Sequence, residues 1–230
     1  MRLYWKIAAP ILCAAMIGGA TIAWHIYKTK ADERKLAEAA LACRARAEQG
    51  DVNAEYDLGH VYYHGLGVPV DYAEAFRWYR KAAEQNNIKA QYGLGYMYFH
   101  GQSVPQDYTE ALLWYRKSAD QGYAKAQCNL GSMYFHGQGL PQDYTEALSL
   151  YRKAADQGDA LGESGIGFML WYGYGVPQDR AEANRWFRKA ADQGDEYAMR
   201  AISKPLTEWI KFSLLIQCIG GIILTFNFFR

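Results

Sequence analysis

Apolar and polar residues follow a helical period through the middle of the chain, but each end carries a long run without charge. Residues 7–27 and residues 212–229 contain no Asp, Glu, Lys or Arg. At ~1.5 Å per helical residue these runs would be about 30 and 27 Å long, enough to cross the hydrocarbon core of a membrane. The pattern therefore predicts transmembrane segments over residues 1–30 and 204–230, the first of them a signal anchor.

Each terminal run also has an alternative interpretation. The first could be a cleavable signal peptide, with small residues at a cleavage site over residues 18–20. The second could be a buried helix that docks on the rest of the chain, although its all-round apolar character favours a membrane span. We expect a location in a bacterial inner membrane, with export to the periplasm after signal cleavage as the alternative. More Lys and Arg follow the first run than precede it, which favours a cytoplasmic middle without deciding the side.

Between these runs one pattern returns every 36 residues. Each copy has a Gly-x-x-x-Pro loop, an Asp two residues after the Pro, and a Glu three residues after that Asp. The recurring residues are Pro69, Pro105, Pro141 and Pro177, with Asp71, Asp107, Asp143 and Asp179, and with Glu74, Glu110, Glu146 and Glu182. This Asp-to-Glu spacing is that of a capping box, in which the Asp accepts from first-turn amides and the Glu reaches back to the cap N–H. The pattern predicts one helix before each loop and a second helix after each Asp.

The two helices of each copy carry different apolar residues. In the first copy, Ala54, Leu58 and Tyr62 lie on one face of the first helix, because they are four residues apart. The second helix brings large aromatic residues such as Trp78 and Tyr79. One helix pair cannot bury its apolar face alone, so the copies must stack on one another.

We therefore predict an all-α chain whose middle is built from helix pairs. The expected segments are a capping helix over 31–53, full repeats over 54–89, 90–125, 126–161 and 162–197, and a partial repeat over 198–203. The fourth repeat departs from the others, since Gly162 replaces its leading Ala, and Gly165 and Gly167 weaken its first helix.

The repeated pattern, A-x-x-x-L-G-x-x-Y-x-x-G-x-G-V-P-x-D-x-x-x-A-x-x-W-Y-x-K-A-A-x-x-G, resembles the Sel-1-like repeat, a relative of the tetratricopeptide repeat. The resemblance covers about residues 37–202. It implies an α-solenoid of antiparallel helix pairs that serves as a protein-binding scaffold. Some bacterial members carry a cysteine pair in each repeat, and that pair is missing from this sequence.

A second stripe on the first helices is offset from the Ala-Leu-Tyr face. We expect stacking to align it as a row on the inner, concave side, where aromatic residues suit an extended peptide or a helix. The candidate partner-binding residues are Tyr56, His60, Tyr63, Tyr92, Tyr96, Phe99, Phe135, Phe168 and Trp171. Exposure is expected for Tyr56, His60, Tyr92 and Tyr96. The stripe has three positions on each first helix. The residue at the third position, which is Tyr63, Phe99, Phe135 or Trp171, could equally pack between repeats.

Composition gives little support to other kinds of chemistry. The formal net charge of +1 argues against nucleic acid as a partner. His64, His100 and His136 recur once per repeat, too far apart for one metal ion, and we expect them to satisfy backbone groups at helix ends. The pair His60 and His64 lacks a third ligand. The sequence has no P-loop, dinucleotide fingerprint or serine nucleophile elbow.

Three functions follow in decreasing order of support. The first is a membrane-anchored scaffold or adaptor that binds a partner protein or peptide, with no cofactor, no metal and no catalytic residue. The second is a membrane structural subunit that self-associates, with small residues in both terminal runs available for close helix contact. The third is a metal-dependent hydrolase that uses His60 and His64.

Overall fold

The computed structural model describes residue 32 and residues 34–203. The predicted transmembrane segments, residues 1–30 and 204–230, lie outside these residues. Every regular element in the described part of the chain is a helix, as predicted. No helix there combines the length and the apolar character that a membrane crossing requires.

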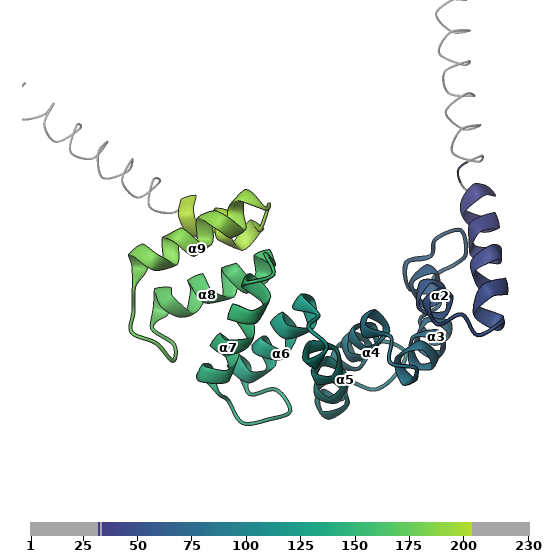
Figure 1. Ribbon diagram of the computed structural model, residues 1–230, viewed down its shortest axis with the longest axis horizontal. Helices are drawn as coiled ribbons and strands as arrows, with labels where there is room; N and C mark the ends of the chain where they lie inside the picture. The colour runs from purple at the N-terminus through teal and green to yellow at the C-terminus, as the bar shows by residue number, and fades with distance from the viewer. Residues whose placement is uncertain (1–31, 33, 204–230) are drawn as a thin grey trace, which may run out of the picture. The chain divides into compact units, whose positions relative to one another are not determined.

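The helices follow one another in pairs (Figure 1). A helix over residues 34–48 comes first, and a helical segment over residues 196–203 comes last. Between them lie α2 (Val52–His64), α3 (Tyr72–Glu84), α4 (Ile88–His100), α5 (Tyr108–Asp120), α6 (Ala124–His136), α7 (Tyr144–Ala155), α8 (Ala160–Tyr172) and α9 (Arg180–Asp192). Thus α2, α4, α6 and α8 are the first helices of their repeats, and α3, α5, α7 and α9 are the second helices. The chain divides into two compact units, Met1–Ala90 and Gln91–Arg230.

Each second helix begins at the Asp that the repeat pattern marks. Asp71 Oδ1 accepts hydrogen bonds from the backbone N–H groups of Ala73 and Glu74, both at 3.0 Å. Asp107, Asp143 and Asp179 also cap their helices through side-chain oxygens. These bonds satisfy amides that the first helical turn leaves without an intrahelical partner.

The predicted return bond from the capping-box Glu is replaced by another contact. The cap N–H of Asp71 donates instead to the carbonyl of Tyr62 on the preceding helix, at 3.0 Å. The corresponding N–H of Asp143 donates to Tyr134 in the same way, also at 3.0 Å. The cap N–H is therefore already satisfied by the first helix of its own repeat, and this bond ties the two helices of the pair together.

Glycine ends first helices where the loop must reverse direction. Gly137 follows α6 with φ 68°, a left-handed conformation that costs little without a Cβ. Its N–H donates to the carbonyl of Met133, which continues the hydrogen-bond ladder past the last helical residue. The loop then carries the chain to the Asp143 cap of α7.

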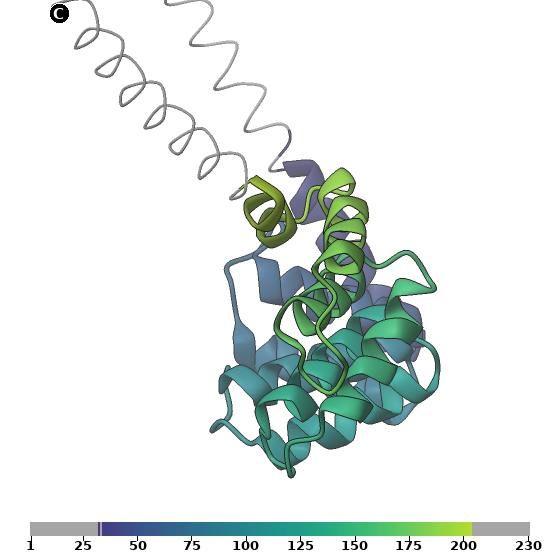
Figure 2. The same cartoon turned by 90° about the vertical axis from the view of Figure 1, so that its left-hand side faces the viewer.

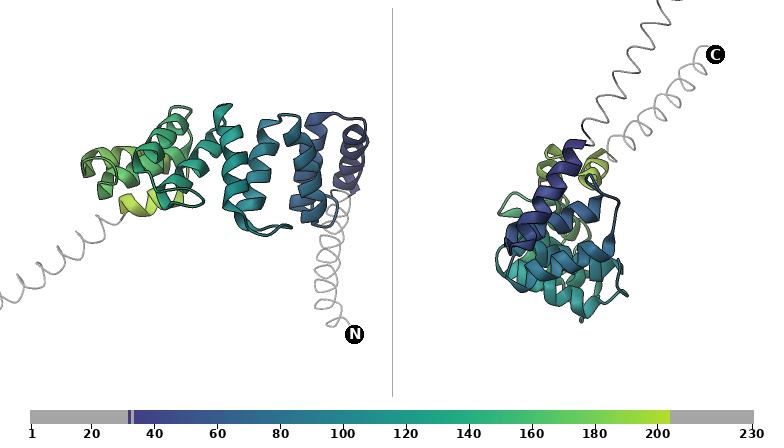
Figure 3. Two further views of the ribbon diagram at one scale, coloured as in Figure 1. Left: turned by 90° about the horizontal axis from the view of Figure 1, so that it is seen from below. Right: turned by 90° about the vertical axis from the view of Figure 1, so that its right-hand side faces the viewer.

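In the first unit, the helix over residues 34–48 packs beside the α2–α3 pair (Figure 3). The buried core joins Ala47 of this helix to Ala54 and Leu58 of α2, with Trp78 of α3 packed against them. The Cys43 thiol donates to the carbonyl of Ala54 at 3.4 Å. This helix covers the apolar face of α2, as a terminal cap should.

The second unit is a stack of helix pairs, which Figure 2 shows from the side of α8 and α9. One core cluster joins α5 and α6 through residues such as Tyr115, Leu130 and Met133, and it reaches Leu150 of α7. A second cluster joins α7, α8 and α9 through residues such as Ile166, Met169 and Phe187. Each pair therefore buries its apolar residues against its neighbour in this unit.

Glycines of the first helices let the aromatic residues of the second helices lie close to the backbone. A Cβ on Gly167 of α8 would lie 2.8 Å from the ring of Phe187, and one on Gly162 would lie 2.8 Å from the backbone nitrogen of Ala155. Gly165 approaches the Tyr151 ring equally closely. The glycines expected to weaken the fourth repeat are thus close-packing positions, and α8 runs unbroken through them.

Candidate functional site

The candidate site is the aromatic stripe, which occupies three equivalent positions on each first helix. Its members are Tyr56, His60 and Tyr63 on α2; Tyr92, Tyr96 and Phe99 on α4; Cys128, Ser132 and Phe135 on α6; and Ser164, Phe168 and Trp171 on α8. Cys128 and Ser164 are buried, and the other members are half-buried. The side chains are therefore partly covered by their neighbours. Partner binding by them stays a prediction, as does their position on a concave face.

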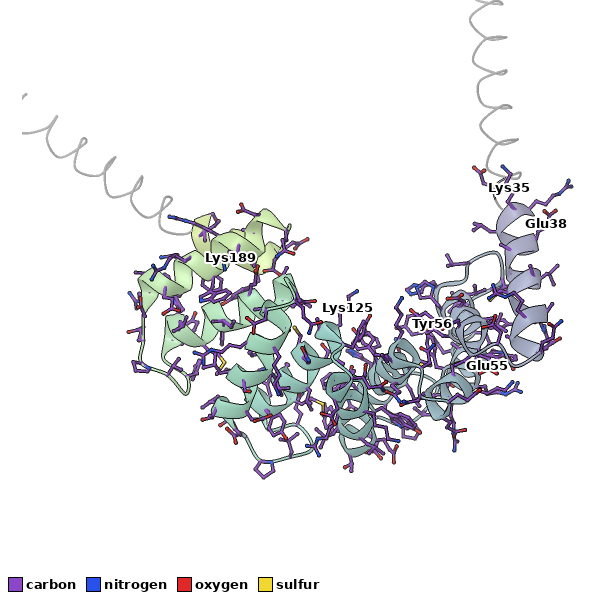
Figure 4. The ribbon with its side chains drawn as sticks, viewed as in Figure 1. Lys35, Glu38, Glu55, Tyr56, Lys125 and Lys189 are labelled. Carbon is purple, nitrogen blue, oxygen red and sulfur yellow. The ribbon has the colours of Figure 1, made fainter. Side chains whose placement is uncertain are left out.

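In the first unit the stripe rests on residues of α3. The ring of Tyr56 stacks on that of Tyr79, with centroids 5.8 Å apart, and it lies 6.3 Å from the ring of His60 (Figure 4). Tyr63 contacts the ring of Tyr72 edge-on at 5.3 Å. The Lys89 ammonium lies 5.9 Å from the centroid of Tyr56. One face of each stripe residue is thus fixed by packing within the unit.

In the second unit, Tyr92 of the stripe contacts rings on several elements. Its ring lies 5.3 Å from Tyr123, 5.8 Å from Tyr115 and 6.4 Å from Tyr96. Its hydroxyl also forms a side-chain hydrogen bond with Asn129 of α6. Tyr92 therefore joins α4 to α6 through both its ring and its hydroxyl.

The third stripe residue of each first helix packs against the start of the second helix of its own repeat. Phe99 lies 5.2 Å from Tyr108, and Phe135 lies 5.1 Å from Tyr144. In the fourth repeat, where Arg180 takes the tyrosine position, its guanidinium lies 5.3 Å from the Trp171 ring centroid. Phe135 additionally reaches Phe168 of the next repeat at 5.6 Å. Both packing within a repeat and packing between repeats are thus present.

Burial raises the pKa of tyrosines in and next to the site. It raises the pKa of Tyr92 to about 12, with the neighbouring Tyr123 contributing, and it raises the pKa of Tyr151 to about 12. The pKa of Tyr123 is also raised, by burial and by the nearby Asp159 carboxylate. At neutral pH these phenols remain available as hydrogen-bond donors.

The histidines form aromatic contacts at the helix ends. His64 lies 4.3 Å from His60, His100 lies 4.1 Å from Tyr96, and His136 lies 4.9 Å from Phe135, all measured between ring centroids. Burial lowers the pKa of His60, and the adjacent His64 lowers it further. Within the described residues no group of three or more His, Cys, Asp or Glu could hold a metal ion.

A polar ladder links the two helices of every repeat, and sequence reasoning missed it. A Gln just after each second helix donates its side-chain amide to a buried Glu or Gln of the first helix, thirty residues earlier. The four pairs are Gln85 with Glu55 at 2.6 Å, Gln121 with Gln91 at 2.8 Å, Gln157 with Gln127 at 2.9 Å, and Gln193 with Glu163 at 2.9 Å. A further contact, between Lys81 Nζ and Glu55 Oε1 at 2.8 Å, balances the charge of the fully buried Glu55. The sequence contained a signal for this ladder, because a Gln recurs every 36 residues just after each second helix.

Charge is distributed unequally between the two kinds of helix. The second helix α9 alone carries Arg180, Glu182, Arg185, Arg188, Lys189 and Asp192. By contrast, Lys89 is the one formally charged residue of α4, and Lys125 is that of α6. In α8 the one charged residue, Glu163, is buried. The solvent-facing side chains of α4, α6 and α8 are thus largely uncharged, and several are aromatic, whereas α2 also carries the exposed Asp57.

A family model, Sel1 repeat, matches four consecutive stretches of the chain, residues 52–87, 88–123, 124–159 and 160–195. The chain belongs to the Sel1 repeat family. Sel1 repeats form a helical scaffold of stacked pairs, and their typical role is binding to other proteins. The sequence resemblance and the helix pairs seen in each unit agree with this assignment. The comparison with curated proteins found no match.

Solved Sel1 repeat structures resemble this chain. A protective antigen of uropathogenic Escherichia coli that displays an SLR fold is 39% identical, with a TM-score of 0.65 and 69% of this chain covered. The match spans only 34% of the length of that antigen. A Sel1 repeat protein from Oxalobacter formigenes is 34% identical, with a TM-score of 0.68, and the match covers 72% of this chain and 68% of the other. A Klebsiella pneumoniae Sel1 repeat protein, 22% identical with a TM-score of 0.56 over 69% of this chain and 76% of the other, shares the fold.

Proposed function

We propose that this Sel1 repeat chain is a membrane-anchored adaptor without enzymatic activity, which holds a partner protein on the aromatic stripe of its first helices. The observation that carries the proposal is the unequal distribution of charge. Ion-bearing side chains concentrate on the second helices, whereas the first helices present half-buried aromatic residues with few charges. Interface centres are depleted in charge and enriched in aromatic residues.

Half-buried tyrosines suit this role. Their rings are held on one side by the packing described above, so little conformational entropy remains to be lost when a partner covers the other side. Their hydroxyls stay protonated and can donate to the backbone of a bound segment. An extended peptide or a helix laid across consecutive first helices of the second unit would meet an aromatic side chain of the stripe on each of them.

The test uses substitutions by residues that other repeats of this chain carry at the equivalent positions. Ser164 stands where α4 has Tyr92, and Ser132 stands where α4 has Tyr96, so the double variant Tyr92→Ser, Tyr96→Ser keeps residues that this fold accommodates. A proximity-labelling enzyme inserted after Gln102, in the α4–α5 loop, would record the neighbours of the wild-type and variant chains in living cells. We expect the double variant to lose a specific set of labelled proteins while its circular dichroism is unchanged.

The matched control removes apolar surface from a second helix. Leu113 of α5 is 45% exposed, and Leu113→Ser should leave the labelled set intact. A labelled set that survives the double tyrosine change, or that Leu113→Ser removes equally, would contradict binding through the aromatic stripe.

The anchoring part of the proposal rests on the two uncharged runs of the sequence. Alkaline carbonate washing of membranes should retain the full chain, and removal of both residues 1–30 and residues 204–230 should release the remainder. Recovery of the full chain in the soluble fraction would contradict anchoring while leaving the adaptor role to be judged by the labelling experiment.

A further inference from the structure

The first helices share a capping position, and one of them breaks its rule. Asp51, Asn87, Asp159 and Asp195 stand at equivalent places, and each accepts a hydrogen bond from a first-turn N–H through its side-chain oxygen. At the same place before α6 stands Tyr123, whose side chain makes no cap hydrogen bond. A residue of the Asp or Asn type is strongly preferred here, so the tyrosine is unfavourable for the helix start.

The Tyr123 ring joins the α4 part of the aromatic stripe. It meets the Tyr92 ring edge-on, with centroids 5.3 Å apart, and Tyr92 in turn contacts Tyr96 and bonds to Asn129. All four of these side chains are half-buried, so each keeps an accessible part. We call Tyr92, Tyr96, Tyr123 and Asn129 the Tyr123 platform.

The charged residues of the two first helices that carry this platform, α4 and α6, have one sign. Lys125 is exposed two residues after Tyr123, and neither α4 nor α6 contains an Asp or a Glu. The carboxylate that interacts electrostatically with Tyr123 is that of Asp159, at the start of α8. Its Oδ1 already accepts from the Cys128 thiol at 3.2 Å and from the N–H groups of Leu161 and Gly162. Lys125 is thus the charge that a bound segment would meet on α6.

Departures from a local structural rule are expected at functional or strained positions of a protein. Here the chain has replaced a helix cap by an aromatic side chain on the proposed binding surface. Tyrosine is also among the residue types most enriched at the energetic centres of interfaces. The substitution therefore has a functional explanation that fits its surroundings.

We propose that Tyr123 is the anchor that sets the specificity of this Sel1 repeat chain, and that the bound segment carries an apolar side chain for the Tyr123 platform and a carboxylate for Lys125. This inference rests on the proposed adaptor function and adds the partner's chemistry to it. Loss of the Tyr123 ring should remove the contact with the apolar side chain of the bound segment. Loss of the Lys125 charge should weaken the preference for segments with acidic residues. The two changes act on separate parts of the bound segment.

The probe is a displayed library of random peptides of about twelve residues, a length that spans more than one repeat when extended. It is selected on the full chain in lipid nanodiscs, after depletion on empty nanodiscs. Peptides that combine an aromatic or aliphatic residue with Asp or Glu should be enriched, and their Kd is then measured by fluorescence anisotropy. Enrichment of basic peptides would overturn the assignment of a carboxylate to Lys125.

The decisive variant is Tyr123→Asn, because Asn87 shows that asparagine caps a first helix at this position. We expect Kd to rise about tenfold or more, with a melting temperature that is equal or higher. Lys125→Gln should raise Kd about threefold or more and reduce its dependence on salt. The matched control, Lys153→Gln, removes an exposed lysine from the second helix α7 and should leave Kd unchanged.

The outcomes separate this inference from the proposed function. If peptide binding is lost in the Tyr92→Ser, Tyr96→Ser variant but kept in Tyr123→Asn, the stripe binds and the role of Tyr123 is wrong. If no peptide is enriched over empty nanodiscs, both the anchor and peptide binding by the stripe are contradicted.

Discussion

Gln193 donates its side-chain amide to the carboxylate of Glu163, 2.9 Å away and thirty residues earlier in the chain. Glu163 is buried, with 6% of its surface exposed, whereas Gln193 lies at the exposed end of α9. The Glu163 carboxylate, which is buried between the two helices, is therefore hydrogen-bonded by a residue at the surface, Gln193. The same bond recurs in each repeat, which makes the polar ladder a fixed part of the unit.

Glu163 gives a direct test of what the ladder contributes. Glu163→Gln keeps an acceptor for Gln193, as Gln91 and Gln127 show at equivalent positions, so the free energy of unfolding should change by less than about 0.5 kcal/mol. Glu163→Leu removes the acceptor and should lower it by about 1 kcal/mol. Urea unfolding of the two variants, followed by circular dichroism, measures the difference. Equal stability of the two variants would show that the bond is not a net contributor.

Gly167 and Gly131 test the close packing of aromatic residues on glycines. A Cβ at Gly167 would lie 2.8 Å from the ring of Phe187, which is only 1% exposed and has no room to move. At Gly131 the nearest atom of the half-buried Tyr151 would be 3.2 Å away. Gly167→Ala should therefore lose about 1–3 kcal/mol to overpacking, partly offset by up to about 1 kcal/mol of helix propensity.

Gly131→Ala should lose less stability than Gly167→Ala, because its nearest contacts, the Tyr151 ring at 3.2 Å and the Ala147 carbonyl at 3.3 Å, would have to give only by a few tenths of an ångström. Thermal unfolding of both variants gives the comparison. A Gly167→Ala chain that is as stable as Gly131→Ala would contradict the tight contact with Phe187.

Asp143 and Glu146 separate the two halves of the predicted capping box. Asp143 Oδ1 accepts from the N–H groups of Thr145 and Glu146 at 2.9 and 3.0 Å, so Asp143→Ala should cost about 1 kcal/mol of stability. The Asp143 N–H is taken by Tyr134, which leaves Glu146 only its favourable charge near the helix start. Glu146→Ala should accordingly cost a few tenths of a kcal/mol. Chemical denaturation of both variants measures the two losses of stability. An equal loss would indicate that Glu146 does bond to the Asp143 N–H, as a reciprocal capping box requires.

Local sequence rules predicted much of the fold, because its elements depend on local chemistry. The Asp caps, the glycine at the end of α6 and the 36-residue period each involve residues close together in the chain, and the structure confirms the helices that they predicted. The chain resembled Sel-1-like repeats for the same reason, and the family match confirms it.

Contacts between distant residues were harder to predict. Glu55 and Glu163 look like surface residues of a helix, and only the Gln thirty residues later explains their burial. Tyr56 and Tyr92 were expected to be exposed, but Tyr79 and Tyr115 of the second helices cover one face of each ring. The capping-box Glu was expected to bond to the N–H of the cap Asp, but a carbonyl of the preceding helix accepts from that N–H instead.

Alkaline pH should destabilise the folded chain through its buried tyrosines. Burial raises the pKa of Tyr92 and of Tyr151 to about 12, from 10.0 for an ordinary tyrosine. The folded state therefore disfavours the phenolate, so the stabilisation is complete below pH 10 and is lost as pH rises from 10 towards 12. Urea midpoints measured between these pH values should fall steadily, and Tyr151→Phe should make the fall shallower because it removes one of the titrating groups. The hydroxyl of Tyr151 forms a hydrogen bond with Ser132, so the variant should also be slightly less stable at pH 8. A pH dependence identical to that of the wild-type chain would mean that Tyr151 is not protected from solvent in the folded state.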